Sequence, residues 1–286
     1  MPDSAAIALA LAEFRVRGVV CVRSVLDPEV LVSMQDPVER ALTSRATADL
    51  SEMGRHLAAA GETVLTDGAG RGRFVSGVDH WRTQPEFLEF AQSAPLVTLV
   101  SALLESSALW LYEDSVLVKE PGTAQRTAWH QDLGYFHLDG HQLATTWCPL
   151  DRVTPETGAV QYVIGSHHWP SVYRPNLFVS PMTIPGTAGD EVPDIDAMAA
   201  AGECEVVSFS TEPGDVVIHH ARTLHAAGPN TSPVTRRRAI SVRYCGDDAR
   251  TFVRPGAPRK AHQEAWIDGQ VLDPVEHPQV GPVPRR

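Results

Sequence analysis

The feature that most constrains the fold is a series of short apolar or β-branched runs, which begins near residue 109 and ends near residue 244. Glycine, proline and aspartate separate these runs, as in proteins built from many short strands joined by turns. The pattern therefore predicts an all-β sandwich or jelly roll. Its predicted strands are Ser115–Val118, Leu143–Leu150, Ala159–Ile164, Glu205–Phe209, Val216–His219 and Arg238–Tyr244.

The segment before these runs has a mainly helical pattern. Apolar residues at helical spacing predict helices over Ser4–Val16, after an N-capping Asp27, and over Pro85–Leu104, with a β-rich run at 18–23. No evident linker interrupts the 286 residues, so we expect a single domain. It would consist of a mainly helical layer (1–108), a β-core (109–253) and a proline-containing surface tail (254–286).

The net charge limits the kinds of binding partner to expect, and the cysteine spacing limits the kinds of metal site and the cellular compartment. The chain has 35 acidic and 24 basic residues, a net charge of −11, which argues against nucleic acid or an anionic membrane as the main partner. The early apolar stretch Ala5–Ala12 lacks a basic leader, so we expect neither a signal peptide nor a membrane span. The four cysteines form no CxxC pair, which excludes a zinc ribbon and favours reduced thiols in the cytoplasm.

A histidine and an aspartate two residues apart, His130 and Asp132, form the most informative motif. On a strand, residues i and i+2 point to the same face, so both side chains can meet one metal ion. With a second histidine from elsewhere they would form the 2-His-1-carboxylate triad of non-haem Fe(II) oxygenases. The pair alone is weak evidence, because His137 and Asp139 repeat it seven residues later.

The context of the second half of the chain supports the first pair. A Pro-Gly-Asp turn at 213–215 precedes a predicted strand, and His225 follows shortly before a Gly-Pro-Asn turn at 228–230. Three arginines, Arg236 to Arg238, then open the next strand. A histidine at a strand end and an arginine on the following strand suit a metal ligand beside a carboxylate clamp.

With these motifs in order, the sequence resembles the phytanoyl-CoA dioxygenase family of iron- and 2-oxoglutarate-dependent oxygenases, from about Leu11 to Tyr244. The matching blocks are Val118–Gly122, Trp129–Tyr135, Gly158–His167, Gly214–His220, and His225 with Gly228–Asn230 and the arginine cluster. The resemblance implies a double-stranded β-helix core, a jelly-roll and cupin-like fold, with N-terminal helices. It also implies Fe(II), 2-oxoglutarate and O2 as cofactor and cosubstrates.

Carried over position by position, the resemblance assigns individual residues. The iron ligands would be His130, Asp132 and His225. Neighbours of 2-oxoglutarate would be Gln131, Trp147, Ser115 and Leu117. This chain departs from the family's pattern at Ala227, where a small polar residue is usual, and the linker before the arginine strand is one residue longer. The clamp is therefore Arg236 or Arg237, and strand alternation favours Arg237, on one face with Ala239 and Ser241.

The sequence gives weaker support for a functional role of other polar residues. Glu113, Lys119, Tyr135 and His137 are candidates for substrate contact. Lys119 could equally cap a strand end, and His137 and Asp139 are expected in a loop over the pocket mouth. Of His219 and His220, one should pack in the strand, and the other should be solvated or support the metal ligands. The Pro- and Gly-rich segment Gly165–Gly202 is long enough to predict a mobile, functional lid.

The function predicted from these residues is oxidation, most simply hydroxylation, of a small neutral or cationic metabolite, with release of succinate and CO2. Desaturation, cyclisation or epimerisation by a related oxygenase stays open. A non-catalytic jelly-roll binding protein is the alternative of another class, and a cupin-like enzyme without 2-oxoglutarate is disfavoured by the arginine cluster. Related oxygenases that halogenate carry a small residue in place of the carboxylate, so Asp132 predicts oxygenation.

Overall fold

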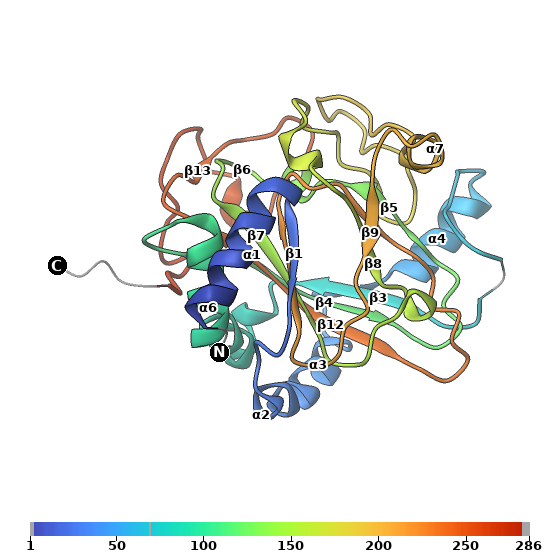
Figure 1. Ribbon diagram of the computed structural model, residues 1–286. Helices are drawn as coiled ribbons and strands as arrows, with labels where there is room; N and C mark the ends of the chain where they lie inside the picture. Colours follow the sequence, from blue (N-terminus) through green and yellow to red (C-terminus); the bar gives the residue numbers. More distant parts are fainter. Residues whose placement is uncertain (1–2, 69, 282–286) are drawn as a thin grey trace.

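The computed structural model describes residues 3–68 and 70–281, and within these ranges a larger and a smaller antiparallel sheet face one another (Figure 1). The larger sheet has the strand order β1-β10-β7-β12-β4-β3-β2. Its strands are β1 (Val19–Val22), β2 (Thr47–Asp49), β3 (Phe74–Val78), β4 (Trp110–Lys119), β7 (Leu143–Pro149), β10 (Val216–His220) and β12 (Arg237–Cys245). The smaller sheet, in the order β5-β11-β8-β9, has β5 (Thr127–His130), β8 (Val160–Val163), β9 (Val206–Ser208) and β11 (His225–Ala227). The predicted jelly-roll fold is confirmed.

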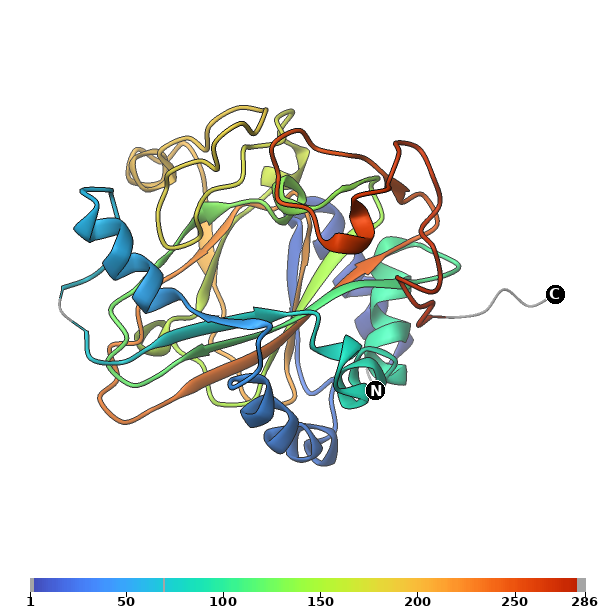
Figure 2. The same ribbon diagram turned by 180° about the vertical axis from the view of Figure 1, so that it is seen from behind.

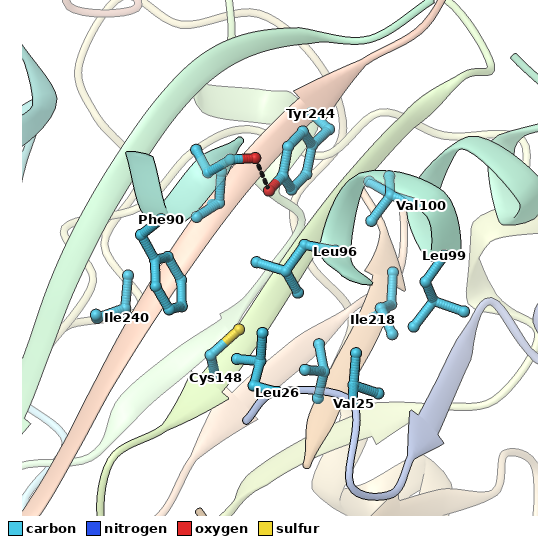
Figure 3. Packing of buried hydrophobic residues seen from close by; sticks show 14 of the residues in the cluster. Val25, Leu26, Phe90, Leu96, Leu99, Val100, Cys148, Ile218, Ile240 and Tyr244 are labelled. Carbon is cyan, nitrogen blue, oxygen red and sulfur yellow. Dashed lines mark hydrogen bonds between the residues drawn. The ribbon is translucent and has the colours of Figure 1, made fainter. Parts of the chain in front are cut away.

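Alternation along the strands of the larger sheet separates two apolar layers. Cys148, Ile218 and Ile240 face the helices, where they pack with Leu96 and Phe90 in the main core (Figure 3). The neighbouring Trp147, Val217 and Ala239 face the smaller sheet instead. Because of this two-residue period, side chains on the face opposite the helices point into the space between the two sheets, where polar residues can also lie.

Helices cover the outer face of the larger sheet, with bounds that partly correct the sequence-based ones. On this face lie α1 (Ser4–Arg17), α2 (Pro28–Ser33), α3 (Gln35–Ala41), α5 (Pro85–Ala91) and α6 (Ala94–Leu104). Helix α4 (Leu50–Ala59) packs instead with Phe74 and Val179, and α7 (Ile195–Ala200) packs with Val163 and Leu224. The single helix expected over 85–104 is wrong, since Pro95 in the first turn of α6 cannot continue a helix from α5. Within the described ranges no single helix is long and apolar enough to span a membrane, and α5 and α6 pass that test only as a pair bent by 51°.

The boundary expected at residue 108 is not a structural boundary. Strands β1, β2 and β3 come from the predicted helical layer and extend the larger sheet at both edges. The C-terminal segment is also more than a surface tail, because Leu272 and His277 are buried and the Leu111 amide donates to the Pro278 carbonyl (Figure 2, red). The last five residues of that predicted tail, 282–286, lie outside the described ranges.

Candidate metal centre and adjoining cavities

Three predicted ligands meet between the two sheets. His130 ends β5, Asp132 begins the short 3₁₀ helix Asp132–Tyr135, and His225 begins β11 as the strand partner of His130. One ligand atom of each lies within 4.8 Å of the others, and all three side chains are buried. The structure thus brings the predicted 2-His-1-carboxylate set together.

Backbone carbonyls orient both imidazoles. Nδ1 of His130 lies 2.8 Å from the Ala128 carbonyl, and Nδ1 of His225 lies 3.0 Å from that of Thr223. Because a carbonyl only accepts, Nδ1 carries the proton and Nε2 keeps a lone pair for a metal. Burial lowers the pKa of His130 and, far more, that of His225, which keeps both rings neutral and able to bind a cation.

The Asp132 carboxylate is held by one oxygen. Its Oδ2 accepts hydrogen bonds from Thr145 Oγ1 at 2.5 Å and His219 Nε2 at 3.2 Å, while Oδ1 lies 3.7 Å from His225 Nε2. Burial alone would raise the pKa of this carboxyl, but the hydrogen bond from His219 and the charge of Arg243 hold the pKa well below its usual range. Asp132 is therefore ionised, with one oxygen free for a metal.

An inner cavity of about 50 Å³ extends from the triad and is lined by Leu117, Trp147, Tyr162 and Arg237. Arg237 is buried, and no hydrogen bond or ion pair of its guanidinium is recorded within residues 3–68 and 70–281. Its guanidinium carbon lies 5.6 Å from the centre of the Trp147 ring, and burial lowers its pKa to about 10. A buried cation without a counter-charge is unfavourable, so the cavity suits an anion.

The other two arginines of the cluster face away from this cavity. Arg236 pairs with Glu39 and Glu120, and Arg238 forms two hydrogen bonds with the Asp151 carboxylate. These pairs neutralise both guanidinium groups at the surface. The structure therefore places Arg237, and neither neighbour, where a cosubstrate carboxylate could reach it.

An outer cavity of about 370 Å³ adjoins the inner one at the triad. The two cavities share five lining residues: Leu117, His130, Asp132, Phe178 and Arg243. The rest of the outer lining is mostly small or apolar, apart from Ser115, Glu113 and Tyr135. The Glu113 carboxylate pairs with Lys260 at 2.6 Å and with Arg243 at 3.4 Å. Tyr135 stacks edge-on against His130, with ring centres 5.7 Å apart. Ser115 thus lines the outer rather than the inner cavity.

Three candidates from the sequence point elsewhere. Gln131 faces away from the triad, donating to the Arg222 carbonyl and accepting from the Tyr173 amide. Lys119 is buried and donates to the carbonyls of Gln125 and Gly228, so it neither reaches a described cavity nor caps an exposed strand end.

His137 is likewise committed to backbone groups. It is buried between the Pro258 carbonyl and the Arg254 amide, and Asp139 beside it is exposed. The expected loop over the pocket mouth is therefore wrong. The described cavities beside the triad do not include either residue.

Further residues complete the site, and of these the sequence had offered only His219, as one of two histidines expected to support the metal ligands. Thr145 from β7 and His219 from β10 hold Asp132, and Arg243 from β12 lines both cavities. Phe178, in the segment 165–202, has a φ of +66° and its ring lies 5.1 Å from that of His130. Thr145, Arg243 and Phe178 lie outside the recognised motifs, so only the fold shows that they reach the triad.

Hydrogen bonds join the segment 165–202 to β5. Asn176 is buried and donates to the Trp129 carbonyl, and the Ala128 amide donates to the Phe178 carbonyl. Tyr135 donates its hydroxyl to Asn176. These bonds fix Phe178 at the junction of the two cavities.

A family model described as Phytanoyl-CoA dioxygenase (PhyH) matches residues 14–239. A probable alpha-ketoglutarate-dependent hypophosphite dioxygenase of Stutzerimonas stutzeri is 30% identical over 141 residues, 49% of this chain and 46% of the relative. A probable phytanoyl-CoA dioxygenase of Caenorhabditis elegans is 24% identical over 185 residues, 63% of this chain and 57% of the relative. The chain spans about half the length of these curated relatives. The resemblance stated from the motifs is confirmed.

Solved structures share the fold over nearly the whole chain. The non-haem alpha-ketoglutarate-dependent epimerase SnoN from nogalamycin biosynthesis has a TM-score of 0.71 at 23% identity, covering 99% of this chain and 100% of its own. The carbocyclase SnoK from the same biosynthesis has a TM-score of 0.68 at 22% identity, covering 95% of each chain. EctD from S. alaskensis, with bound Fe, has a TM-score of 0.61 at 18% identity, covering 86% of this chain and 79% of its own.

Proposed function

Because the chain belongs to the phytanoyl-CoA dioxygenase family, we propose that it is an Fe(II)- and 2-oxoglutarate-dependent dioxygenase acting on a small molecule. The observation that carries the proposal is a buried His-Asp-His triad that shares a cavity with the unpaired Arg237. When bound, iron and 2-oxoglutarate supply O2 activation, oxidising the substrate with release of succinate and CO2.

The residues present fit these groups. Two neutral imidazoles and one carboxylate oxygen match the ligand preference of Fe(II) and leave open positions for cosubstrates. His130, Asp132 and His225 would hold the iron, and Arg237 would bind the distal carboxylate of 2-oxoglutarate beside Trp147. Thr145 and His219 keep Asp132 oriented by occupying its second oxygen.

Arg237→Gln is expected to raise the apparent dissociation constant of 2-oxoglutarate by ten-fold or more. A charge-assisted bidentate pair in a dry site contributes about 1.5–3 kcal/mol, and about 1.4 kcal/mol corresponds to one decade. The measurement is 2-oxoglutarate binding to the iron-loaded protein under nitrogen. Arg236→Gln is the control. If it weakens binding and Arg237→Gln does not, the clamp is misassigned.

The outer cavity is the proposed substrate site, since its lining includes His130 and Asp132 but not Arg237. Most of its lining is apolar or small, and its Glu113 carboxylate is paired with Lys260 and Arg243, which favours a neutral substrate. Two neighbours were crystallised with nogalamycin RO and with 5-hydroxyectoine, which supports a small molecule without naming it.

Phe178→Ala is expected to lower substrate-coupled turnover several-fold, while iron content stays at the wild-type level. The ring separates the two cavities beside His130 but offers no metal ligand. The measurement compares the ratio of oxidised product to succinate in the two proteins. An unchanged ratio with the native substrate would rule out a role for the segment 165–202 in shaping the substrate site.

Succinate release tests the function as a whole. The purified protein, given Fe(II), ascorbate and 2-oxoglutarate, should release succinate above the level of Arg237→Gln, and a metabolite panel should raise the rate further. A non-catalytic binding protein would release none. Because SnoN is an epimerase and SnoK a carbocyclase, the product also needs identification by mass. Hydroxylation adds one oxygen, cyclisation or desaturation removes two hydrogens, and epimerisation leaves the mass unchanged.

A further inference from the structure

Arg243 is a cation beside the triad whose side chain is 13% exposed, and the proposed function gives it no role toward the cosubstrate. It lies on β12 on the same face as Arg237 and lines both cavities. Its partner on β7 is Thr145, whose hydroxyl donates to Asp132, and its partner on β4 is Glu113. This register places Arg243 at the metal end of the inner cavity, whereas Arg237 pairs with Lys119 further along the strands.

The guanidinium of Arg243 is incompletely paired. Its Nη1 donates to Ser115 Oγ at 2.6 Å and lies 3.4 Å from Glu113 Oε1, while Nε is buried without a partner among the described residues. The other oxygen of Glu113 is bound by Lys260 at 2.6 Å. Glu113 therefore shares its charge between two cations, and its closer contact is with Lys260.

The spacing of the two cavity arginines matches a ligand with two anionic ends. Six residues separate them along β12, which places their Cα atoms about 20 Å apart at the usual rise of a strand. Long side chains from both positions converge on the inner cavity between them. A 2-oxo dicarboxylate carries one carboxylate at each end. If Arg237 were its only arginine partner, the carboxylate beside the metal would have no cationic partner except the metal itself.

We propose that Arg243 binds the carboxylate next to the keto group of 2-oxoglutarate, with Ser115 and Glu113 as positioning residues that hold the guanidinium. This rests on the proposed function. It changes the roles expected for two sequence candidates: Ser115 acts on the cosubstrate through Arg243, and Glu113 serves the same arginine instead of contacting substrate.

Binding of two 2-oxo acids distinguishes the role of Arg243 from that of Arg237. 2-Oxoglutarate and 2-oxopentanoate have the same number of carbons and the same metal-binding end, but 2-oxopentanoate lacks the distal carboxylate. Each acid is titrated into Fe(II)-loaded protein under nitrogen, followed by the visible charge-transfer absorption of the complex and by calorimetry. Arg243→Gln should weaken both acids by about ten-fold or more, whereas Arg237→Gln should weaken 2-oxoglutarate alone.

Control variants guard against indirect effects. Arg236→Gln removes an arginine from the outer face of the same segment and should bind both acids as the wild type does. Ser115→Ala should weaken both acids two- to five-fold, because it only loosens Arg243. Iron content and thermal unfolding, measured for each variant, separate a lost contact from a lost site or fold.

The outcomes distinguish this inference from the function beneath it. Arg243→Gln binding both acids normally, or weakening 2-oxoglutarate alone, would overturn the inference and leave the proposed function intact. Wild-type protein that binds iron but neither acid would overturn both. If Arg243→Gln does not fold, Arg243→Lys decides, because it keeps the charge but loses the fork: equal several-fold weakening of both acids supports the inference, and unchanged binding contradicts it.

Discussion

Replacing His225 by alanine is expected to remove the bound iron and all 2-oxoglutarate turnover. His225 supplies one of three protein ligands, and its Nδ1 proton is fixed on the Thr223 carbonyl so that Nε2 faces Asp132. Two remaining ligands on one side of the ion cannot define a facial site. The measurements are iron per protein chain after anaerobic loading and succinate release, both of which should fall to the background level.

The second His-x-Asp pair provides the matched control. His137→Asn removes a buried histidine of the same motif type whose nitrogens contact the backbone at Pro258 and Arg254. It should lower the midpoint of thermal unfolding but keep the wild-type iron content. Equal iron content in the wild type and His225→Ala would contradict the ligand assignment, as would iron loss in His137→Asn alone.

The triad was predictable because its information is local in the sequence. His130 and Asp132 are two residues apart at a strand end, and His225 stands before a recognisable Gly-Pro-Asn turn. Arg237 also followed from local information, because two-residue alternation on β12 separates it from Arg236 and Arg238. These predictions needed the face on which a residue lies and no knowledge of which strands are neighbours.

Most residues around the triad depend on strand order and were not predictable in that way, and for the support of Asp132 the sequence left His219 and His220 open. Thr145 and His219 are on strands that pair with one another, and their side chains meet Asp132 only because the two sheets face each other. Arg243 reaches the same place through its register with Thr145. Register depends on turn geometry and on the neighbouring strands as well as on the pattern of one strand, so a local motif does not specify it.

The mistaken candidates share another cause. Gln131, Lys119 and His137 are polar residues in or beside the motifs; the resemblance suggested Gln131, and nearness to the motifs suggested the other two. In the structure each satisfies carbonyl or amide groups of distant loops, such as the Gly228 and Pro258 carbonyls. Buried backbone polar groups need partners, and these side chains supply them.

Wild-type protein in excess chloride or bromide is expected to form no halogenated product. Asp132 Oδ1 faces the two histidines, so the carboxylate occupies the position that a halide would need, and its negative charge disfavours a second anion on the metal. Thr145 and His219 hold the other oxygen and keep the carboxylate from swinging away. Asp139 cannot replace it, being exposed beside a histidine bound to the Pro258 carbonyl.

Mass spectrometry of products formed with and without halide measures this directly. Asp132→Ala should lose oxygenation completely, since it removes both the ligand oxygen and the charge that balances the metal. Asp132→Glu tests position, because one additional methylene displaces the carboxylate from Thr145 and His219; we expect at least a ten-fold loss of turnover with iron partly retained. A halogenated product from the wild type would overturn both the reaction class and the role of Asp132, because the carboxylate would then have to leave the metal despite its two hydrogen bonds.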